Sequence, residues 1–226
     1  VAIVHITHAL SNTSHILPVA KICKLAKRFL TITIVDAAQS IGAVEVKTSK
    51  WEADFILGTG VKFLCAGPGA CFLYASDAML KICKPVDVGW FSHEDPFEMD
   101  IERFRYARDA MRFFGGTPSP QPLAMAISAL KLWNEIGLEN VQTRIQDHLT
   151  ALAEELPDEV LISPKYSIPR GASLVVSPKN AHILRNALKA KGIKYDERRT
   201  GFRFSVHCYT REDDIDMLKA CLKTVV

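Results

Sequence analysis

An aspartate and a lysine lie where two apolar runs of the N-terminal half come to an end. The β-branched run 31–35 stops at Asp36, and the run 55–57 leads through Gly-Thr-Gly to a turn that carries Lys62. If both runs are parallel strands of one sheet, the carboxylate and the amine emerge at the same edge, where open α/β sheets bind their ligands. An acid and an amine that face one crevice suggest a cofactor site.

The elements around these two residues alternate between strand and helix. Strand patterns occur at residues 1–6, 31–35 and 55–57. Between the first two, the stretch 18–29 has apolar residues at helical spacing and begins with a proline suited to a first helical turn. This alternation predicts right-handed βαβ units and a mainly parallel sheet. The run 70–75 follows Lys62 too closely for a crossover helix, so we expect it to pair antiparallel.

The middle of the chain is less regular. Residues 87–112 hold aromatic and charged side chains without a clear period, which is typical of a long excursion at a functional site or an interface. A Gly-Gly-Thr-Pro-Ser-Pro stretch breaks the chain at 115–120, and helical spacing then returns over 121–156.

The last third mixes strands and helices in a way typical of a small α+β unit. Strands are expected at 172–176 and 202–206, and helices at 181–191 and 211–225. Thr210 and Asp213 match an acidic capping box for the last helix. The whole pattern predicts an α/β fold, with a three-layer αβα domain and a mainly parallel sheet over residues 1–156. A small α+β domain would follow over residues 157–226.

Composition narrows the classes of function. The chain has 226 residues, 48% hydrophobic and 23% charged, which is typical of a globular protein. Its net charge of +3 is not gathered into one tract, which disfavours nucleic-acid binding. No apolar run reaches the ~18 residues that span a bilayer and no signal peptide is visible, so we expect no membrane association. The six cysteines form no CxxC pair, which favours free thiols and a cytoplasmic protein.

Other site chemistries find little support. His5 and His8 lie around a strand end, and the sequence has no HExxH motif, so we expect no metal site. A G-x-S-x-G nucleophile elbow is absent as well. The Gly-Pro-Gly turn at 67–69 lacks the GK[ST] sequel of a phosphate loop and leads into a strand.

Four strings, in this order, carry a family resemblance: VDAAQSIG, GTGVKFLCAGPGACFLY, RFFGGTPSPQP and GFRFSVHCYTREDDIDML. They resemble the strings VDGAQS, SGHKW-GPGG-GFLY, GTPN and vRiS-YNT-eDid of the aminotransferase class-V family of pyridoxal-phosphate (PLP) enzymes. The stretch VGWFSHEDPFEMD is similar to the kynureninase-like branch. The resemblance implies fold type I, with part of the large PLP-binding domain followed by the small C-terminal domain.

The resemblance gives the opening pair specific roles. Lys62 would form a Schiff base with the PLP aldehyde and then move the proton at the substrate α-carbon, while Asp36 would keep the pyridine nitrogen protonated. Without the resemblance, the competing interpretation is a solvated loop lysine and a carboxylate that caps a strand end.

Further positions are implied to contact the cofactor. Gln39 would hydrogen-bond the phenolic oxygen, Ala38 would lie against the ring, and Thr59 stands where the family has a phosphate-binding serine. Thr117 corresponds to a residue that reaches the phosphate in the neighbouring subunit, which implies a homodimer with shared active sites. Asn12 lies where relatives often carry an asparagine that contacts cofactor or substrate, with a plain Asx-turn as the alternative.

Three positions concern the amino-acid substrate. Arg203 matches the arginine that binds the substrate α-carboxylate, since a guanidinium suits a planar carboxylate, and Arg198 and Arg199 are its rivals. Trp90 and His93 are candidates for the wall of the substrate pocket, with simple packing as the alternative.

The sequence also departs from the family pattern. Val61 replaces the histidine before the lysine and removes one expected phosphate donor, and Ala37 replaces a glycine. The chain opens directly on a strand pattern at Val1, without the first half of the usual large domain. We therefore expect a fragment, a natural truncation or one piece of a nicked enzyme.

The reaction is open to several interpretations. Our first expectation is a PLP-dependent aminotransferase, and the alternative is a kynureninase-like hydrolase that cleaves the side-chain bond of an aryl amino acid. A second alternative is a truncated or degenerate member without catalysis. A desulfurase is disfavoured because residues 195–203 hold no cysteine and Cys208 comes after the strand.

Overall fold

The computed structural model describes residues 1–100 and 102–225 of the chain. Its N-terminal sheet has four strands in the order β1-β2-β3-β4, namely β1 (Ile3–Thr7), β2 (Ile32–Asp36), β3 (Phe55–Thr59) and β4 (Cys71–Ala75). The first three strands are parallel and β4 pairs antiparallel with β3. The predicted mainly parallel sheet and the antiparallel run at 70–75 are both confirmed.

Helices cover one face of this sheet. Helix α1 (Val19–Lys27) and the short α2 (Thr48–Trp51) place apolar side chains against β1, β2 and β3. The core consists mainly of Ile6, Val19, Cys23, Val35, Trp51 and Ile56, each no more than 6% exposed. Within the described residues the opposite face is much more open, since Ile3 and Leu73 are 53% and 42% exposed. The α/β class is confirmed, and the described chain supplies one of the two expected helical layers.

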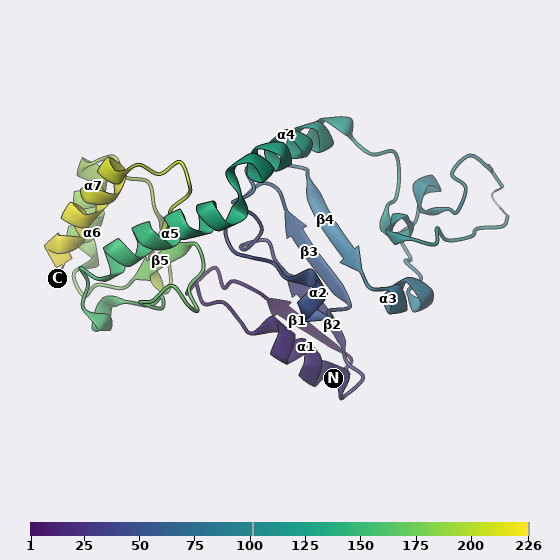
Figure 1. Ribbon diagram of the computed structural model, residues 1–226, viewed down its shortest axis with the longest axis horizontal. Coiled ribbons are helices and arrows are strands. Elements are labelled where there is room, and N and C mark those ends of the chain that lie inside the picture. Colours follow the sequence, from purple (N-terminus) through teal and green to yellow (C-terminus); the bar gives the residue numbers. More distant parts are fainter. Residues whose placement is uncertain (101, 226) are drawn as a thin grey trace.

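Helix α3 (Asp77–Ile82) leads into a long irregular segment, which we call the excursion: residues 83–100 and 102–119. It contains two short 3-10 turns, η1 (Trp90–Ser92) and η2 (Ala110–Phe113). Figure 1 shows it at the end of the sheet opposite the C-terminal helices. The predicted irregular stretch is confirmed.

Two helices lead from the excursion to the last third of the chain. Helix α4 (Pro120–Ile136) begins with a proline in its first turn, and Gly137, at φ +83°, separates it from α5 (Leu138–Ala153). Helix α4 packs on the turn after β3, with Ala126 against Leu64 and Ala66. Among the helices of the described residues, none has the length and apolar character needed to cross a bilayer.

The C-terminal region, residues 138–225, has its own sheet and core (Figure 1). Its strands are β5 (Ser173–Val176), β6 (Asp196–Arg198) and β7 (Gly201–Ser205), in the antiparallel order β5-β7-β6. Helices α6 (Ala181–Ala190) and α7 (Glu212–Leu222) and the turns η3 (Asp158–Val160) and η4 (Lys223–Val225) complete it. Helix α5 also contributes to this core, so the predicted boundary at residues 156 and 157 stays a prediction.

The start of α7 differs from the prediction by one residue. The carboxylate of Asp214, not Asp213, accepts the backbone N–H of Arg211 at 3.1 Å. The hydroxyl of Thr210 instead accepts the backbone N–H of His207 at 2.9 Å. The predicted Thr210–Asp213 capping box is therefore wrong, because the loop before the helix already uses the threonine.

Candidate functional site

Asp36 and Lys62 emerge at the same edge of the N-terminal sheet. Strands β2 and β3 are parallel, with Asp36 beside Leu57, so both strands end at the edge that points toward the C-terminal region (Figure 1). The Asp36 carboxylate is half-buried and accepts the backbone N–H of Ala38 at 2.8 Å. Asp36 thus provides a fixed carboxylate at this edge of the sheet, although it does not itself line the pocket around Lys62.

A tight turn after β3 presents Lys62 to solvent. Gly60 donates its N–H to the carbonyl of Ala70, and its own carbonyl accepts the N–H of Ala66, both within 2.9 Å. A Cβ on Gly60 would lie 2.8 Å from the Cβ of Ala66, so the turn has no room for a side chain there. The closed turn leaves Lys62 exposed, with its side chain at the crevice.

The structure brings Lys62, Gln39 and Arg203 together around one open pocket of about 260 Å³. The other lining residues are Phe63, Cys65, Ser205, Val206, His207, Tyr209 and Thr210. Lys62 and Gln39 come from the N-terminal sheet and Arg203 from β7 of the C-terminal region. The pocket therefore lies at the junction of the two regions.

Arg203 is held by partners on both sides of its guanidinium. Its Nη1 donates to the Ser11 hydroxyl at 2.8 Å, and its Nη2 lies 2.9 Å from an Asp196 carboxylate oxygen. Its Nε is buried and has no partner among the described residues. Burial and the nearby Arg198 lower the pKa of Arg203, and Asp196 opposes this shift. Any carboxylate that binds Arg203 must therefore compete with Asp196 and Ser11 for this side chain.

The loop after β1 connects the two sides of the pocket. The Ser11 hydroxyl also accepts from the Gln39 amide at 3.3 Å, while the Asn12 side-chain oxygen accepts from Arg198 at 3.0 Å. Arg198 also pairs with Asp196 and so stabilises the β6-β7 hairpin. Arg199, the other alternative to Arg203, is exposed. Asn12 thus lies beside the pocket without lining it.

Sequence reasoning missed Ser11, Asp196 and His207. Ser11 had a signal, since it is the neighbour of Asn12 in the same loop. Asp196 pairs with Arg198 and Arg203 inside the β6-β7 hairpin, a pairing that the expected strands did not include. His207 contacts Phe63, which is distant in the chain, so no local pattern pointed to it.

Other cofactor candidates lie close to the sheet edge. Ala38 follows Asp36 directly and is half-buried. The Thr59 hydroxyl at the end of β3 faces the backbone N–H of Val61 at 3.4 Å. Val61 itself is 51% exposed. A hydroxyl and backbone N–H groups of a glycine-rich turn suit a phosphate, so the donor set fits PLP despite the valine.

The structure does not bring Trp90, His93 and Thr117 to the Lys62 pocket of the same chain. Trp90 and His93 line a separate cavity of about 310 Å³ in the excursion, together with Phe104. Thr117 is exposed in the turn before α4. Within one chain these three residues therefore make no part of the pocket.

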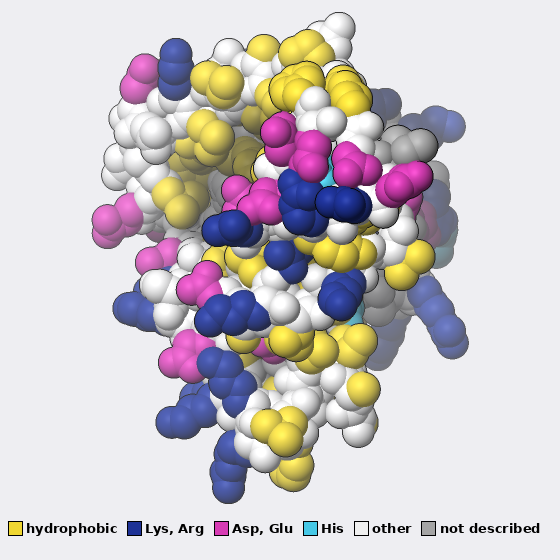
Figure 2. Space-filling model, turned by 90° about the vertical axis from the view of Figure 1, so that its right-hand side faces the viewer, with side chains coloured by type: hydrophobic (Ala, Val, Ile, Leu, Met, Phe, Trp, Pro, Cys, Tyr) yellow, Lys and Arg dark blue, Asp and Glu magenta, His cyan; other side chains and the backbone are white. Residues whose placement is uncertain are grey.

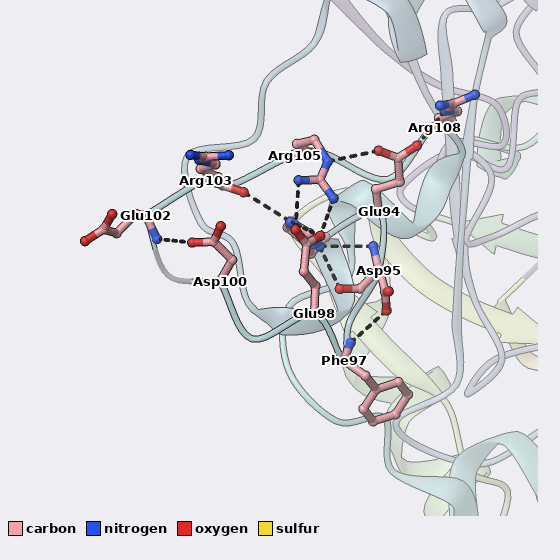
Figure 3. Close-up of polar contacts among 10 residues, drawn as sticks. Glu94, Asp95, Phe97, Glu98, Asp100, Glu102, Arg103, Arg105 and Arg108 are labelled. Atoms are coloured by element: carbon pink, nitrogen blue, oxygen red, sulfur yellow. Dashed lines mark hydrogen bonds and ion pairs between the residues drawn. The ribbon is translucent and has the colours of Figure 1, made fainter.

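An ion-pair network shapes the loop around His93 (Figure 3). Glu94 accepts from Arg105 at 3.3 Å and from Arg108 at 2.7 Å, and Glu98 also pairs with Arg105. These arginines lower the pKa of Glu94. Figure 2 shows acidic and basic side chains mixed across this face, with hydrophobic side chains beside them. Because these charges are paired within the described part of the loop, they stabilise its shape.

Metal chemistry finds no site in the part of the chain that the structure describes. No group of three or more histidine, cysteine or acidic side chains there could hold a metal ion.

Comparisons with known proteins place the chain in a family. The model of the family described as "Aminotransferase class-V" matches residues 1–218. The kynureninase of Deinococcus radiodurans is 33% identical over 74% of this chain and 42% of its own length. A probable cysteine desulfurase of Chlamydia muridarum is 29% identical over 98% of this chain and 55% of its own length.

A solved structure carries the cofactor. It is a mutant of C-DES with glycine covalently linked to PLP, and it matches with a TM-score of 0.82 and 25% identity over 99% of this chain and 60% of its own. The chain thus spans about half the length of the relatives that it matches. The resemblance in the sequence is confirmed: the chain belongs to the aminotransferase class-V family of PLP-dependent enzymes.

Proposed function

We propose that the chain acts on an amino acid through PLP bound at Lys62, and that its reaction is a transamination. The observation that carries this proposal is the pocket in which Lys62 and Gln39 meet Arg203. One wall offers an amine for the cofactor, and the other offers a guanidinium for the α-carboxylate of a substrate.

Each side chain has a definite task in this proposal. Bound PLP supplies an electron sink for the charge that develops at the substrate α-carbon. Lys62 would hold the cofactor through Nζ, and its amine would move a proton at the substrate α-carbon. Asp36 would keep the pyridine nitrogen protonated. Arg203 would bind the substrate carboxylate, which takes the place of Asp196.

A kynureninase-like hydrolase is the second candidate. It is favoured by the identity of 33% with the Deinococcus radiodurans kynureninase over 74% of this chain. The aromatic cavity around Trp90 and His93 would then receive an aryl side chain at the site of a neighbouring subunit.

A desulfurase has weaker support in the pocket, although one of the relatives carries that name. The only cysteine on the described pocket wall is Cys65, an exposed residue whose thiol pKa is raised by partial desolvation and by the nearby Cys208. A raised pKa leaves little thiolate at neutral pH, and the thiolate is the nucleophile. A non-catalytic member is the remaining alternative, and exposed Val61 in place of the family histidine is its main support.

The test begins with the cofactor. We expect the protein to gain a visible absorption band with added PLP and, after borohydride reduction, a mass adduct on the peptide that carries Lys62. Lys62→Ala should abolish both, whereas Lys50→Ala, which removes an exposed lysine of α2, should change neither. A colourless wild-type protein without an adduct would leave the non-catalytic alternative.

Product analysis then separates the reactions. A panel of amino acids that yields keto acids supports transamination, alanine from kynurenine supports the hydrolase, and sulfide from cysteine supports the desulfurase. Keto acids absent from the whole panel would contradict the first choice.

We also propose a homodimer with shared sites. Helix α4 exposes an apolar series within the described chain: Leu123 50%, Met125 49%, Ile127 54%, Leu130 40% and Leu132 55%. A second copy would cover these side chains and bring Thr117 to its neighbour's phosphate site. Sedimentation should show a dimer that Ile127→Glu dissociates, whereas Asn186→Glu, which changes an exposed residue of α6 away from α4, should not. A wild-type monomer would refute the shared site.

The cytoplasm is the compartment that we propose. All six cysteines are free in the structure, which suits a reducing environment.

A further inference from the structure

His207 contacts the turn that carries Lys62 from the opposite side of the pocket. It follows β7 by two residues and is 6% exposed. Its ring lies parallel to that of Phe63, the neighbour of Lys62, at an interplanar angle of 4° and a centroid distance of 6.2 Å. Tyr209 stacks on it at 4.6 Å. The imidazole is therefore fixed in orientation beside the lysine turn.

A hydrogen bond ties this imidazole to the backbone of the turn. Its Nε2 lies 2.7 Å from the carbonyl oxygen of Phe63. Because a carbonyl only accepts, Nε2 carries a proton and donates it. The other ring nitrogen, Nδ1, lies 3.3 Å from the thiol of Cys208, which can donate to it. Both ring nitrogens thus have a partner in the neutral tautomer.

The next carbonyl of the turn is held in the same way. The indole Nε1 of Trp133 on α4 donates to the carbonyl oxygen of Leu64 at 2.8 Å. The Trp133 ring also meets His207 edge-on, with centroids 5.5 Å apart. Two successive peptide carbonyls after Lys62 are therefore fixed by side chains from outside the N-terminal sheet.

We propose that His207 is a positioning residue for Lys62. By holding the Phe63 carbonyl, it sets the backbone from which the Lys62 side chain departs and so the direction of the amine. His207 follows Arg203 by four residues in the same strand and loop, so one segment aims both the lysine and the carboxylate-binding arginine. A small displacement of a reacting group such as the Lys62 amine can slow a reaction strongly. The proposal rests on the function proposed for Lys62.

A matched pair of variants tests this role. In His207→Gln the side-chain amide reaches the place of Nε2 and can still donate to Phe63. In His207→Asn the amide is too short to do so. Both variants lose the ring stacking equally, and thermal unfolding of both checks that they fold.

The first readout needs no cofactor. Hydrogen–deuterium exchange of the peptide that covers 60–66 in the PLP-free protein should be about tenfold faster in His207→Asn than in wild type, and close to wild type in His207→Gln. Equal exchange in the two variants would overturn the proposal. Because PLP is absent, this result does not depend on whether Lys62 binds it.

The second readout is PLP binding, followed by the visible band. The dissociation constant should rise about tenfold in His207→Asn and about threefold or less in His207→Gln. Equal constants would overturn the positioning role even if Lys62 binds PLP. A wild-type protein that binds no PLP would refute the proposed function, and the exchange data would still show whether His207 holds the turn.

Discussion

The C-terminal region and the N-terminal sheet differ in how completely their apolar surfaces are covered. In the C-terminal region, Ile145 and Leu149 of helix α5 pack into a core with Leu174 of β5, and all three are 0% exposed. The N-terminal sheet is packed on one face, and on the other Ile3 and Leu57 remain 53% and 36% exposed in the described chain. Close packing on all sides restricts side chains of the C-terminal region to one orientation, whereas the N-terminal sheet, packed on one face, restricts its side chains less.

The candidate site uses both kinds of environment. Lys62 and Asp36, the groups that we propose for the cofactor, belong to the half-covered sheet. Arg203 and His207, which would orient substrate and lysine, come from the densely packed region. In this proposal, the well-packed C-terminal region therefore positions Lys62 of the more open N-terminal sheet.

The largest expected effect tests the difference in packing. Leu149→Ala should lower the free energy of unfolding by about 2–5 kcal/mol, because it leaves a cavity in a fully buried core. Leu57→Ala on the open face of the sheet should cost less than about 1 kcal/mol. Urea unfolding monitored by circular dichroism measures both. Similar losses for the two variants would show that the sheet face is covered in solution.

An acid titration should distinguish the two regions next. Burial lowers the pKa of His8 from 6.5 to about 4, and its ring packs edge-on against Trp51 in the N-terminal core. As the pH falls, His8 is protonated in the unfolded state near pH 6.5 but in the folded state only near pH 4. The free energy of unfolding therefore has its full His8 contribution above about pH 6.5. This contribution is lost as the pH falls toward 4, by up to about 3 kcal/mol.

His8→Phe provides the control for this titration. The variant keeps an aromatic ring against Trp51 but cannot take up a proton. The free energy of unfolding, measured between pH 7 and 4, should therefore fall less steeply in the variant. An unchanged slope would place the acid-sensitive group elsewhere.

The smallest expected effect concerns the arginine of the pocket. Asp196→Asn should tighten the binding of an amino-acid carboxylate about two- to fivefold, because Asp196 occupies Nη2 of Arg203 and repels an incoming anion. Glu197→Gln is the matched control, since that acid pairs with Arg185 on the surface. Calorimetric titration with alanine into the PLP-free protein gives the affinities. Weaker binding in Asp196→Asn would mean that the acid orients the arginine.

Local patterns were enough to predict most of the fold. The β-branched runs gave β2 and β3 with Asp36 and Lys62 at one edge, and the short link after Lys62 gave the antiparallel β4. Most site contacts could not be predicted because they join distant parts of the chain. The pair of Ser11 and Arg203 depends on how the two regions dock, which no local period encodes.

The excursion shows the same limit. Trp90 and His93 lie in a segment without periodicity, so the sequence could not tell which cavity they line. The capping box failed for a different, local reason, since the Thr210 hydroxyl already accepts the backbone N–H of His207, three residues earlier.

The Ser11 hydroxyl oxygen accepts hydrogen bonds from two residues of the candidate site. Its oxygen has two lone pairs, and Arg203 and Gln39 each donate a hydrogen bond to it. If the Arg203 side chain rotated toward an arriving anion, it would release the Ser11 oxygen. The Gln39 amide would then be the remaining one of these two donors. Arg203, proposed for the substrate, and Gln39, proposed for the cofactor, therefore share one acceptor, so that an anion bound at the arginine would alter the hydrogen bonding of the glutamine.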